Sequence, residues 1–414
     1  MVKARNGIIA AVDLGSSKVC CFIARVEGNN QLRVVGIGHQ PSSGIKGGNI
    51  VDMEAAEHAL SSAVNAAEQM CGERVEEVIV GVGGGYPASH TFGVEVAIGG
   101  HEVADKDIRR VLSQVHLPAE TSDRELIHTM PIGYSIDGRG GVRDPRGMYG
   151  ERLGVDVHLV TAASGAMRNL GICVKRAHLE IADRCVTSFA AGLASLVQDE
   201  MDLGVTLIDM GGGTTSISVF YDGNLIYTDS IPVGGNHVTH DIARGLSTPV
   251  ADAERMKILY GRSVNKPNDE YEIIDVPLIG EQEHTEPNHV PRSVLVGIIR
   301  PRIEETFELV RGRLEASGVD KLTGRRIVLT GGASQLDGIA QSAAQILNKQ
   351  VRNGRPVRVT GLAEATGGPA FSACAGLLTY ALRAQSAGTA ASAPGSEAEA
   401  SRFGRLGSWL RENF

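Results

Sequence analysis

The stretch Asp209-Met-Gly-Gly-Gly-Thr-Thr215 decides the fold, because an earlier stretch, Asp13-Leu-Gly-Ser-Ser-Lys18, has the same pattern. Each begins with an aspartate, passes through glycine and continues with small hydroxyl residues. Each also interrupts a run of β-branched and apolar residues, which is typical of a tight turn between two β-strands. The repeated pattern predicts two related halves in one chain.

Each copy lies in a predicted three-stranded meander. The expected strands cover residues 8–12, 19–23 and 32–35 around the first copy, and residues 205–208, 217–220 and 225–227 around the second. Asp222-Gly223 is typical of a hairpin turn between the last two strands. An ordinary glycine-rich hairpin would explain one copy, but it explains two copies in matching settings poorly.

Both turns have the chemistry of a phosphate-binding loop. Glycine lets the backbone approach a ligand closely and turn its amides towards phosphate oxygens, and hydroxyl groups add donors. The Lys18 ammonium would offset phosphate charge, while Asp13 and Asp209 would hold Mg²⁺ through its water ligands, because Mg²⁺ loses its hydration shell reluctantly. The residues expected to bind nucleotide here are Asp13, Gly15, Ser16, Ser17, Lys18, Asp209, Gly211, Gly212, Gly213, Thr214 and Thr215.

Two common nucleotide motifs do not occur in the sequence. A Walker loop requires Gly-Lys followed by serine or threonine, and Gly-Lys is found nowhere in the chain. The glycines of Gly81-Val-Gly83-Gly-Gly85 are followed by Tyr86, where the dinucleotide fingerprint requires another glycine. The nucleotide is therefore expected between the two hairpin turns.

A third glycine motif is expected to bind the adenine ring. The short apolar strand at residues 327–330 stops at Gly331 and Gly332, and a helix is predicted over residues 333–347. Paired glycines between a strand and a helix would let a flat ring lie against the backbone.

A second helix is predicted to start at Thr248-Pro249, and it contains two charged residues of interest. Glu254 and Lys257 lie three residues apart on one face, where they would contact ribose and base. A surface ion pair is the alternative explanation of that spacing.

These segments resemble the phosphate-1, phosphate-2 and adenosine motifs of the superfamily that contains actin, Hsp70 and the sugar kinases. The resemblance implies an actin-like α/β fold with ATP and Mg²⁺ in a cleft between two domains.

Where actin and Hsp70 carry a subdomain, only about 15 residues separate the third strand from the next helix, too few for a folded unit. About 80 residues instead separate the strand at 78–82 from the helix beginning near Gly165, enough for a small domain. A strand at 92–98, a helix at 105–115 and strands at 125–134 and 155–161 are predicted inside them.

A small domain relocated to this place resembles the bacterial cell-division family FtsA. Four further segments follow that family's pattern: residues 44–52, 189–195, 203–209 and 233–243. The resemblance implies a first core (1–82, 163–200 and 366–383), a small subdomain (83–162), a second core (201–235 and 318–365) and a further subdomain (236–317).

The C-terminal residues have the pattern of a tethered amphipathic helix. Residues 384–400 contain no large apolar residue and are expected to form a flexible linker. Residues 401–414 are predicted to form a helix with an apolar face and flanking arginines, which suits an anionic membrane surface; docking on the chain's own globular part is the alternative. The residues expected to contact the membrane are Arg402, Phe403, Leu406, Trp409, Leu410 and Phe414.

The resemblance implies a protein that forms actin-like filaments on the cytoplasmic face of the inner membrane and tethers the FtsZ ring there. It implies that Arg300 and Arg302, on a helix predicted over residues 294–314, bind the FtsZ C-terminal peptide, with routine ion pairing as the alternative. Later division proteins would bind the small subdomain. A PilM-like pilus-assembly protein and a small-molecule kinase or phosphatase of the same superfamily are the alternatives.

The resemblance does not extend to the catalytic acid of Hsp70. Hsp70 has a glutamate at the position that aligns near Thr187, and residues 186–190 contain no acid here. Water attacking a γ-phosphate needs an orienting acceptor, so no catalytic residue is assigned, and ATP is expected to act mainly as a polymerisation switch.

Composition agrees with this interpretation. A net charge of −8 argues against a nucleic-acid surface, and 42% hydrophobic residues are enough for two large cores. Six cysteines without a Cys-x-x-Cys pair are expected to be reduced thiols in a cytosol. The short polar segment of residues 1–7 does not resemble a signal peptide.

Overall fold

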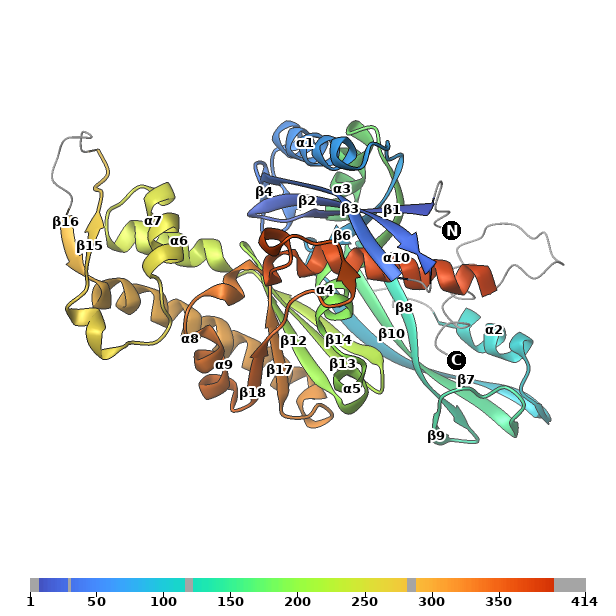
Figure 1. Cartoon of the computed structure of the whole chain (residues 1–414). Coiled ribbons are helices and arrows are strands. Elements are labelled where there is room, and N and C mark those ends of the chain that lie inside the picture. The colour runs from blue at the N-terminus through green and yellow to red at the C-terminus, as the bar shows by residue number, and fades with distance from the viewer. Residues whose placement is uncertain (1–6, 29–30, 116–121, 281–287, 391–414) are drawn as a thin grey trace.

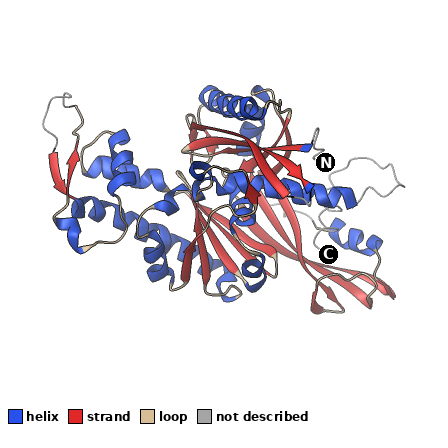
Figure 2. Ribbon diagram, viewed as in Figure 1, coloured by secondary structure: helices blue, strands red, loops and turns tan. Residues whose placement is uncertain are grey.

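Three large β-sheets organise the chain in this computed structural model, which describes residues 7–28, 31–115, 122–280 and 288–390 (Figures 1 and 2). Two of the sheets repeat one topology. In each, a meander of three antiparallel strands is extended by a parallel strand beside its first strand. The predicted duplication and the actin-like fold class are confirmed.

The first sheet has the order β11-β6-β1-β2-β3-β19. Its strands are β1 (Ile8–Leu14), β2 (Lys18–Glu27), β3 (Gln31–Pro41), β6 (Glu77–Val82), β11 (Glu180–Val186) and β19 (Val359–Thr360). Its central strands are almost wholly apolar because both faces are covered. Helices α1 (Met53–Cys71) and α3 (Ser164–Arg176) pack on one face, and α4 (Thr187–Ser195) and α10 (Ser372–Ala390) pack on the other. The Asp52 side chain caps α1 by accepting from the Ala55 N–H at 3.1 Å.

The second sheet has the order β14-β13-β12-β17-β18. Its strands are β12 (Val205–Met210), β13 (Thr215–Tyr221), β14 (Asn224–Ile231), β17 (Arg326–Thr330) and β18 (Gln350–Asn353). One face packs against α6 (Gly235–Gly245), α7 (Val250–Tyr260), α8 (Arg292–Ser317) and α9 (Ile339–Leu347). The other face meets α4 and the short helix α5 (Gln198–Leu203). Helix α4 therefore lies between the two sheets.

The third sheet belongs to residues 83–162, which we call the small subdomain. Its order is β7-β10-β8-β9, from β7 (Ala88–Glu102), β8 (Arg124–Ile136), β9 (Arg139–Val142) and β10 (Tyr149–Ala163). Helix α2 (Asp105–Ser113) covers it and closes a separate apolar core. The strands are longer than predicted, and the short strand β9 was not predicted.

The far end of the molecule holds a smaller group of elements around α6, α7 and the start of α8 (Figure 1, left). A 3-10 helix, η4 (Pro267–Glu270), and the hairpin of β15 (Ile273–Val276) and β16 (Asn288–Pro291) complete it. The remaining short elements are β4 (Ile45–Lys46), β5 (Asn49–Ile50), η5 (Val319–Lys321), η6 (Gly332–Gln335), η7 (Glu364–Thr366) and η8 (Pro369–Phe371). No helix among the described residues is both long and apolar enough to cross a membrane.

Three expectations need correction. Strand β19 lies within residues 318–365, which we expected in the second core, yet it pairs with β3 in the first sheet, where Val359 is buried. Helix α10 continues to Ala390, so the start of the expected linker at residues 384–400 is helical. The helix predicted from residue 333 is divided, because η6 ends at Gln335 and α9 begins only after Gly338, which has a φ of 81°.

Candidate functional site

A cleft of about 760 Å³ lies between the two halves, and all of the residues predicted to bind nucleotide line it. The β1–β2 turn contributes Asp13 and residues 15–18, and the β12–β13 turn contributes Asp209 and residues 211–215. Glu254 and Lys257 come from α7, and Gly331 and Gly332 follow β17. Segments far apart in the sequence therefore converge on one cavity.

The two turns are built in the same way. The Gly15 N–H donates to the Lys18 carbonyl at 3.0 Å, and the Gly211 N–H donates to the Thr214 carbonyl at 2.9 Å. Each bond closes a turn of four residues that begins two positions after its aspartate, and the small residues of the turn line the cleft. The repeated sequence pattern thus gives two equivalent turns facing one another.

The turns approach each other so closely that a side chain at Gly212 or Gly213 would displace groups of the first turn. A Cβ on Gly212 would lie 2.2 Å from the Ser17 hydroxyl oxygen, and a Cβ on Gly213 would lie 2.5 Å from that of Ser16. The Ser17 hydroxyl also donates to the Asn236 side-chain oxygen at 3.2 Å, which links the first half to the start of α6. Asn236 was not predicted, because nothing in its local pattern distinguishes it from a polar helix residue.

Two partly buried carboxylates and one lysine dominate the charge of the cleft. Burial raises the pKa of Asp13 to about 6, although the nearby Lys18 charge lowers it. Burial, and then the charge of Asp13, raise the pKa of Asp209 to about 7. Burial lowers the pKa of Lys18, whose ammonium group lies 3.5 Å from the centre of the Phe371 ring. The single positive charge of Lys18 does not balance the negative charges of the two ionised aspartates, so the cleft favours binding of a further cation.

A metal site built from protein side chains alone needs several ligating side chains around one position. Within the described ranges, no group of three or more His, Cys, Asp or Glu side chains surrounds a possible metal position. The carboxylate pair therefore fits a cation that keeps other ligands, as Mg²⁺ does when it binds through water and phosphate oxygens.

The α7 residues are both an ion pair and part of the cleft wall. Lys257 Nζ lies 2.6 Å from the Glu254 carboxylate and donates to the Thr239 hydroxyl at 2.9 Å and the Gly235 carbonyl at 3.2 Å. The Thr239 hydroxyl also bonds to Glu254. This network fixes both side chains at the rim, where they remain available to polar groups of a ligand.

Gly331 forms the floor beside Asp209. Its φ of 87° lies in the region that favours glycine, and an added Cβ would be 2.4 Å from the Asp209 carboxylate oxygen. The backbone after β17 can therefore approach the cleft as the paired glycines predicted.

Thr187 stands where a catalytic acid would be expected from Hsp70. It begins α4, lines the cleft, and its methyl group and an oxygen of Asp13 are both close to Gly81. A threonine hydroxyl at this point can hold water by hydrogen bonding, but it is a much weaker base than a carboxylate.

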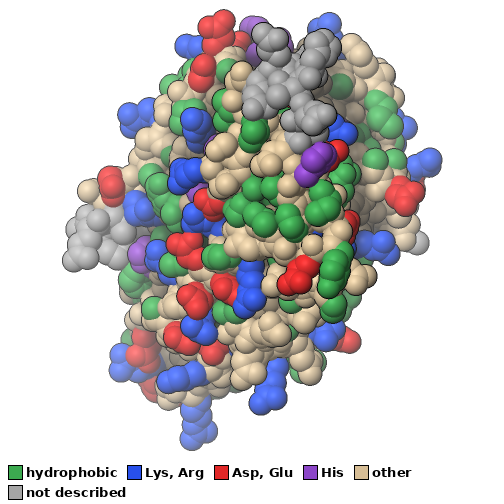
Figure 3. Space-filling model, turned by 90° about the vertical axis from the view of Figure 1, so that its left-hand side faces the viewer, with side chains coloured by type: hydrophobic (Ala, Val, Ile, Leu, Met, Phe, Trp, Pro, Cys, Tyr) green, Lys and Arg blue, Asp and Glu red, His purple; other side chains and the backbone are tan. Residues whose placement is uncertain are grey.

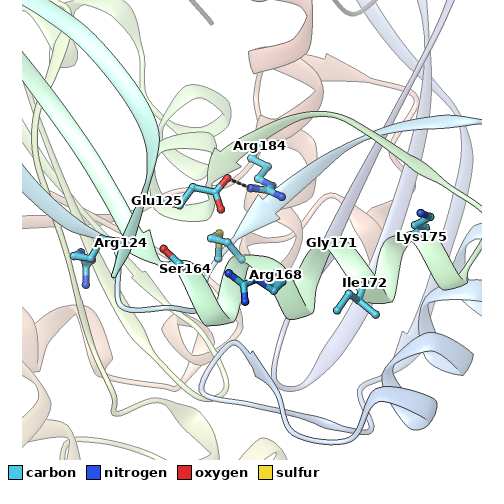
Figure 4. A pocket seen from close by; sticks show the side chains of 9 residues that line it. Arg124, Glu125, Ser164, Arg168, Gly171, Ile172, Lys175 and Arg184 are labelled. Atoms are coloured by element: carbon cyan, nitrogen blue, oxygen red, sulfur yellow. Dashed lines mark hydrogen bonds and ion pairs between the residues drawn. The ribbon is translucent and has the colours of Figure 1, made fainter. Parts of the chain in front are cut away.

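A second, open depression of about 490 Å³ lies where the small subdomain meets α3 and β11 (Figure 4). Arg184 pairs there with Glu125 at 2.5 Å, and Arg124 donates to the Thr161 hydroxyl at 2.8 Å. None of the predicted site residues lines it.

Arg300 and Arg302 lie on α8, outside both cavities. Arg302 makes a two-point contact with Asp241 at 2.6 and 3.1 Å and also pairs with Glu305, and its bonds to Asp241 raise its pKa. Arg300 pairs with Glu304 at 2.7 Å, one turn along the helix. The ion pairs expected under the alternative explanation are therefore present.

The face at this end of the molecule also exposes apolar side chains. Figure 3 shows hydrophobic residues gathered there among acidic and basic ones. The exposed large hydrophobic residues of these elements are Val250, Ile258, Leu259, Tyr271, Ile273, Ile279 and Val294. The predicted membrane residues Arg402, Phe403, Leu406, Trp409, Leu410 and Phe414 lie outside the described residues.

The fold and the cleft define an actin-like protein with a small subdomain inserted in its first half. The family model described as "Cell division protein FtsA" matches residues 206–376, and that described as "SHS2 domain inserted in FTSA" matches residues 84–161. The cell division protein FtsA of Rhizobium meliloti (strain 1021) is 45% identical over 425 residues, covering 99% of this chain and 96% of the relative. The chain belongs to the FtsA family of cell division proteins.

Solved structures share the fold at much lower identity. The PilM–PilN type IV pilus biogenesis complex gives a TM-score of 0.64 at 18% identity and covers 90% of this chain and 98% of that one. MreB5 of Spiroplasma citri bound to ADP gives a TM-score of 0.53 at 15% identity, with coverages of 90% and 95%. These similarities show that the chain shares the fold of these structures.

Proposed function

We propose that this protein binds ATP with Mg²⁺ in the cleft, assembles into actin-like filaments on the cytoplasmic face of the inner membrane, and tethers the FtsZ ring there. Later division proteins would then be recruited through the small subdomain. The observation that carries the nucleotide part is the pair of matching turns, closed by equivalent hydrogen bonds, that face each other across one cavity.

The residues present fit the nucleotide and its metal. Glycines at 212, 213 and 331 leave backbone exposed where side chains would block the cleft. Asp13 and Asp209 supply negative charge for Mg²⁺, and the hydroxyl groups of Ser16, Ser17 and Thr214 supply donors for phosphate. The Thr215 hydroxyl donates to the Val233 carbonyl at 2.8 Å in this structure. MreB5 of Spiroplasma citri, solved bound to ADP, has the same fold, which supports a nucleotide in this cleft.

ATP is proposed to act as a polymerisation switch with at most weak hydrolysis. Thr187 occupies the place of the expected acid, and a hydroxyl orients water less strongly than a carboxylate does. Slow hydrolysis would keep the two halves bridged long enough for filaments to persist.

FtsZ is proposed to bind at the α8 end of the molecule. Arg300 and Arg302 offer guanidinium groups to the carboxylates of an acidic peptide, and exposed apolar residues nearby suit the rest of such a segment. Asp241 and Glu305 hold the Arg302 guanidinium in place in this structure.

Membrane attachment is proposed for residues 401–414 on the basis of sequence. Their apolar face and flanking arginines suit a helix lying in an anionic membrane surface. One short helix binds weakly, so filament formation would strengthen attachment by presenting many copies.

The test combines nucleotide, filament and membrane in one experiment. Purified full-length chain is mixed with anionic vesicles and either MgATP or no nucleotide, and the pellet is examined by sedimentation and electron microscopy. Filaments on vesicles only with MgATP are expected. A chain lacking residues 401–414 should form filaments that stay off the vesicles, and absence of filaments under all conditions would contradict the proposal.

A further inference from the structure

The hairpin of β4 and β5 lies against both phosphate turns. Gly47 and Gly48 form its tip, and the Gly48 N–H donates to the Ser16 hydroxyl oxygen at 2.9 Å. On the other side, a Cβ on Gly213 would lie 2.9 Å from the Gly47 nitrogen. Gly48 lines the cleft as well. The tip therefore contacts a phosphate turn from each half.

The same hairpin contacts the place where the chain passes into the small subdomain. The Asn49 side-chain oxygen accepts from the Gly85 N–H at 2.9 Å, and the Gly85 carbonyl accepts from the Ala163 N–H at 2.8 Å. The chain leaves the subdomain at Ala163, so we call this pair of residues the neck. A Cβ on Gly84 would lie 2.0 Å from the Gly48 carbonyl oxygen, so the backbones of the hairpin and of the chain beside the neck are in close contact.

The small subdomain is also bonded to the second half, although it is inserted in the first. The Ser89 hydroxyl on β7 donates to the Thr228 carbonyl at 2.8 Å and accepts from the Thr228 N–H at 2.5 Å. It thereby satisfies both backbone groups of one residue on the edge strand β14, as a neighbouring strand would. Arg143 and Asp222 add an ion pair between the same two parts.

We propose that Ser16 and the Gly47–Gly48 turn sense the terminal phosphate of a bound nucleotide, and that Asn49, outside the cleft lining, passes this signal to the neck and so sets the orientation of the small subdomain. The inference rests on nucleotide binding in the cleft, as proposed above. The Gly48 amide and the Ser16 hydroxyl are bonded to each other here, and a nucleoside triphosphate offers an additional phosphate that competes for both groups. A diphosphate lacks that phosphate and leaves the bond intact.

The transmission follows from the contacts. Glycines 48, 83 and 84 meet through backbone atoms, so no side chain can absorb a shift of the tip. Asn49 passes the shift to Gly85, and the Ser89 bond to β14 makes the subdomain respond also to the angle between the halves. The subdomain thus has one attachment that follows the phosphates and one that follows closure of the cleft.

Amide hydrogen exchange of the full chain tests this device. The chain is compared with Mg²⁺ and a non-hydrolysable ATP analogue, and with Mg²⁺ and ADP, at concentrations where calorimetry shows both nucleotides bound. Exchange is expected to differ between them in residues 83–102 and 224–231. Asn49→Ala should abolish the difference in residues 83–102 while changing affinity for either nucleotide by less than about threefold.

Two other variants separate the bond from a general loss of structure. Asn49→Asp keeps an oxygen acceptor for the Gly85 N–H and should retain the difference. Asn224→Ala is the control for residues 83–102, because its side chain donates within its own turn, to the Asp222 carbonyl at 3.1 Å. If Asn49→Ala does not fold, Ser89→Ala carries the test. It removes both bonds to Thr228, together with a bond to the His158 ring at 2.8 Å, and should remove the difference in residues 224–231; a difference that survives there would overturn the inference.

The outcomes are distinct. Equal exchange with the two bound nucleotides in the unaltered chain would overturn the inference, as would a difference that survives in Asn49→Ala. Failure of either nucleotide to bind the unaltered chain would overturn the proposed function and this inference with it.

Discussion

Asp13 and Asp209 are the last but one residues of the first strands of the two meanders, and they line one cleft from opposite halves. Burial raises the pKa of Asp13 to about 6, and burial together with the charge of Asp13 raises the pKa of Asp209 to about 7. Ionisation of the pair therefore costs folding free energy unless a cation balances it. Binding chemistry and stability are coupled at these two residues.

The first prediction concerns the pH dependence of unfolding in the absence of Mg²⁺. A carboxyl with a raised pKa favours the folded state at low pH, and this contribution is lost as pH rises through the folded pKa values of about 6 and 7. In Asp209→Asn, the free energy of unfolding should fall less as pH rises. This variant should therefore be more stable than the unaltered chain above pH 7, measured by denaturant unfolding at several pH values. Asp199→Asn, on an exposed helix start, is the control. An unchanged pH profile in Asp209→Asn would contradict the coupling.

The second prediction concerns MgATP affinity. Removing the Asp209 charge should weaken binding by at least about tenfold, or 1.4 kcal/mol, because Mg²⁺ loses one of two anionic partners. In the unaltered chain, affinity should rise with pH through the range in which the aspartates ionise. Isothermal titration calorimetry measures both effects, and equal affinities for the Asn variant and the unaltered chain would count against the cleft as the nucleotide site.

The sequence predicted the duplicated meanders and the candidate nucleotide residues because both depend on local chemistry. Aspartate, glycine and hydroxyl residues have the same conformational and bonding preferences wherever the chain places them. Asn236 and the β4–β5 hairpin were not assigned to the site, since their roles arise only from contacts with residues distant in sequence, such as Ser17 and Ser16.

The errors had a similar origin. Strand β19 is two residues long, and its pairing with β3 depends on tertiary contact rather than on strand propensity. The helical residues 384–390 are small and polar, and they continue a helix whose earlier residues are anchored in the core. Composition alone favours a flexible linker for such residues.

The third prediction concerns Gly331. Alanine there would have both an unfavourable positive φ and a Cβ within 2.4 Å of the Asp209 carboxylate, so unfolding free energy should fall by about 3 kcal/mol and MgATP affinity should fall with it. Gly318→Ala is a control for positive φ without crowding, because Gly318 has a φ of 72° with no atom within 4 Å of the added Cβ. Gly331 combines its positive φ with a ψ of 165°, which other residues adopt less readily still. The Gly318→Ala variant should lose only about 1 kcal/mol of unfolding free energy and should bind MgATP as tightly as the unaltered chain does. Equal losses in both variants, by thermal and denaturant unfolding, would show that crowding at Asp209 does not matter.

The fourth prediction concerns Arg302 and the FtsZ peptide. Arg302→Glu places a third carboxylate beside Asp241 and Glu305, so an acidic peptide should bind at least about tenfold more weakly in fluorescence anisotropy. Arg313→Glu reverses a charge on the same helix, near Asp229, and should affect the peptide little. Unaltered peptide affinity in Arg302→Glu would move the site elsewhere.

The last prediction concerns residues 401–414, whose apolar face should determine membrane affinity more than their charge. Burial of Phe403, Leu406, Leu410 and Phe414 contributes up to roughly 1.5 to 3 kcal/mol per side chain, whereas each arginine near an anionic leaflet adds about 1 kcal/mol. Leu410→Asp interrupts that face and should move the protein to the soluble fraction in vesicle co-sedimentation, while MgATP affinity persists because the cleft residues are unchanged.

A matched control keeps the added charge and changes only its position. Ser408→Asp adds the same carboxylate away from the predicted apolar face and should pellet with vesicles almost as the unaltered chain does. Trp409→Glu, at the edge of the face, should weaken binding because the indole would otherwise lie at headgroup level. Raising the salt concentration should loosen the unaltered chain only partly, since screening removes the arginine contribution and leaves the apolar one. If Leu410→Asp and Ser408→Asp pelleted equally well, the anchor would lie outside this segment, and membrane tethering would lose its main support.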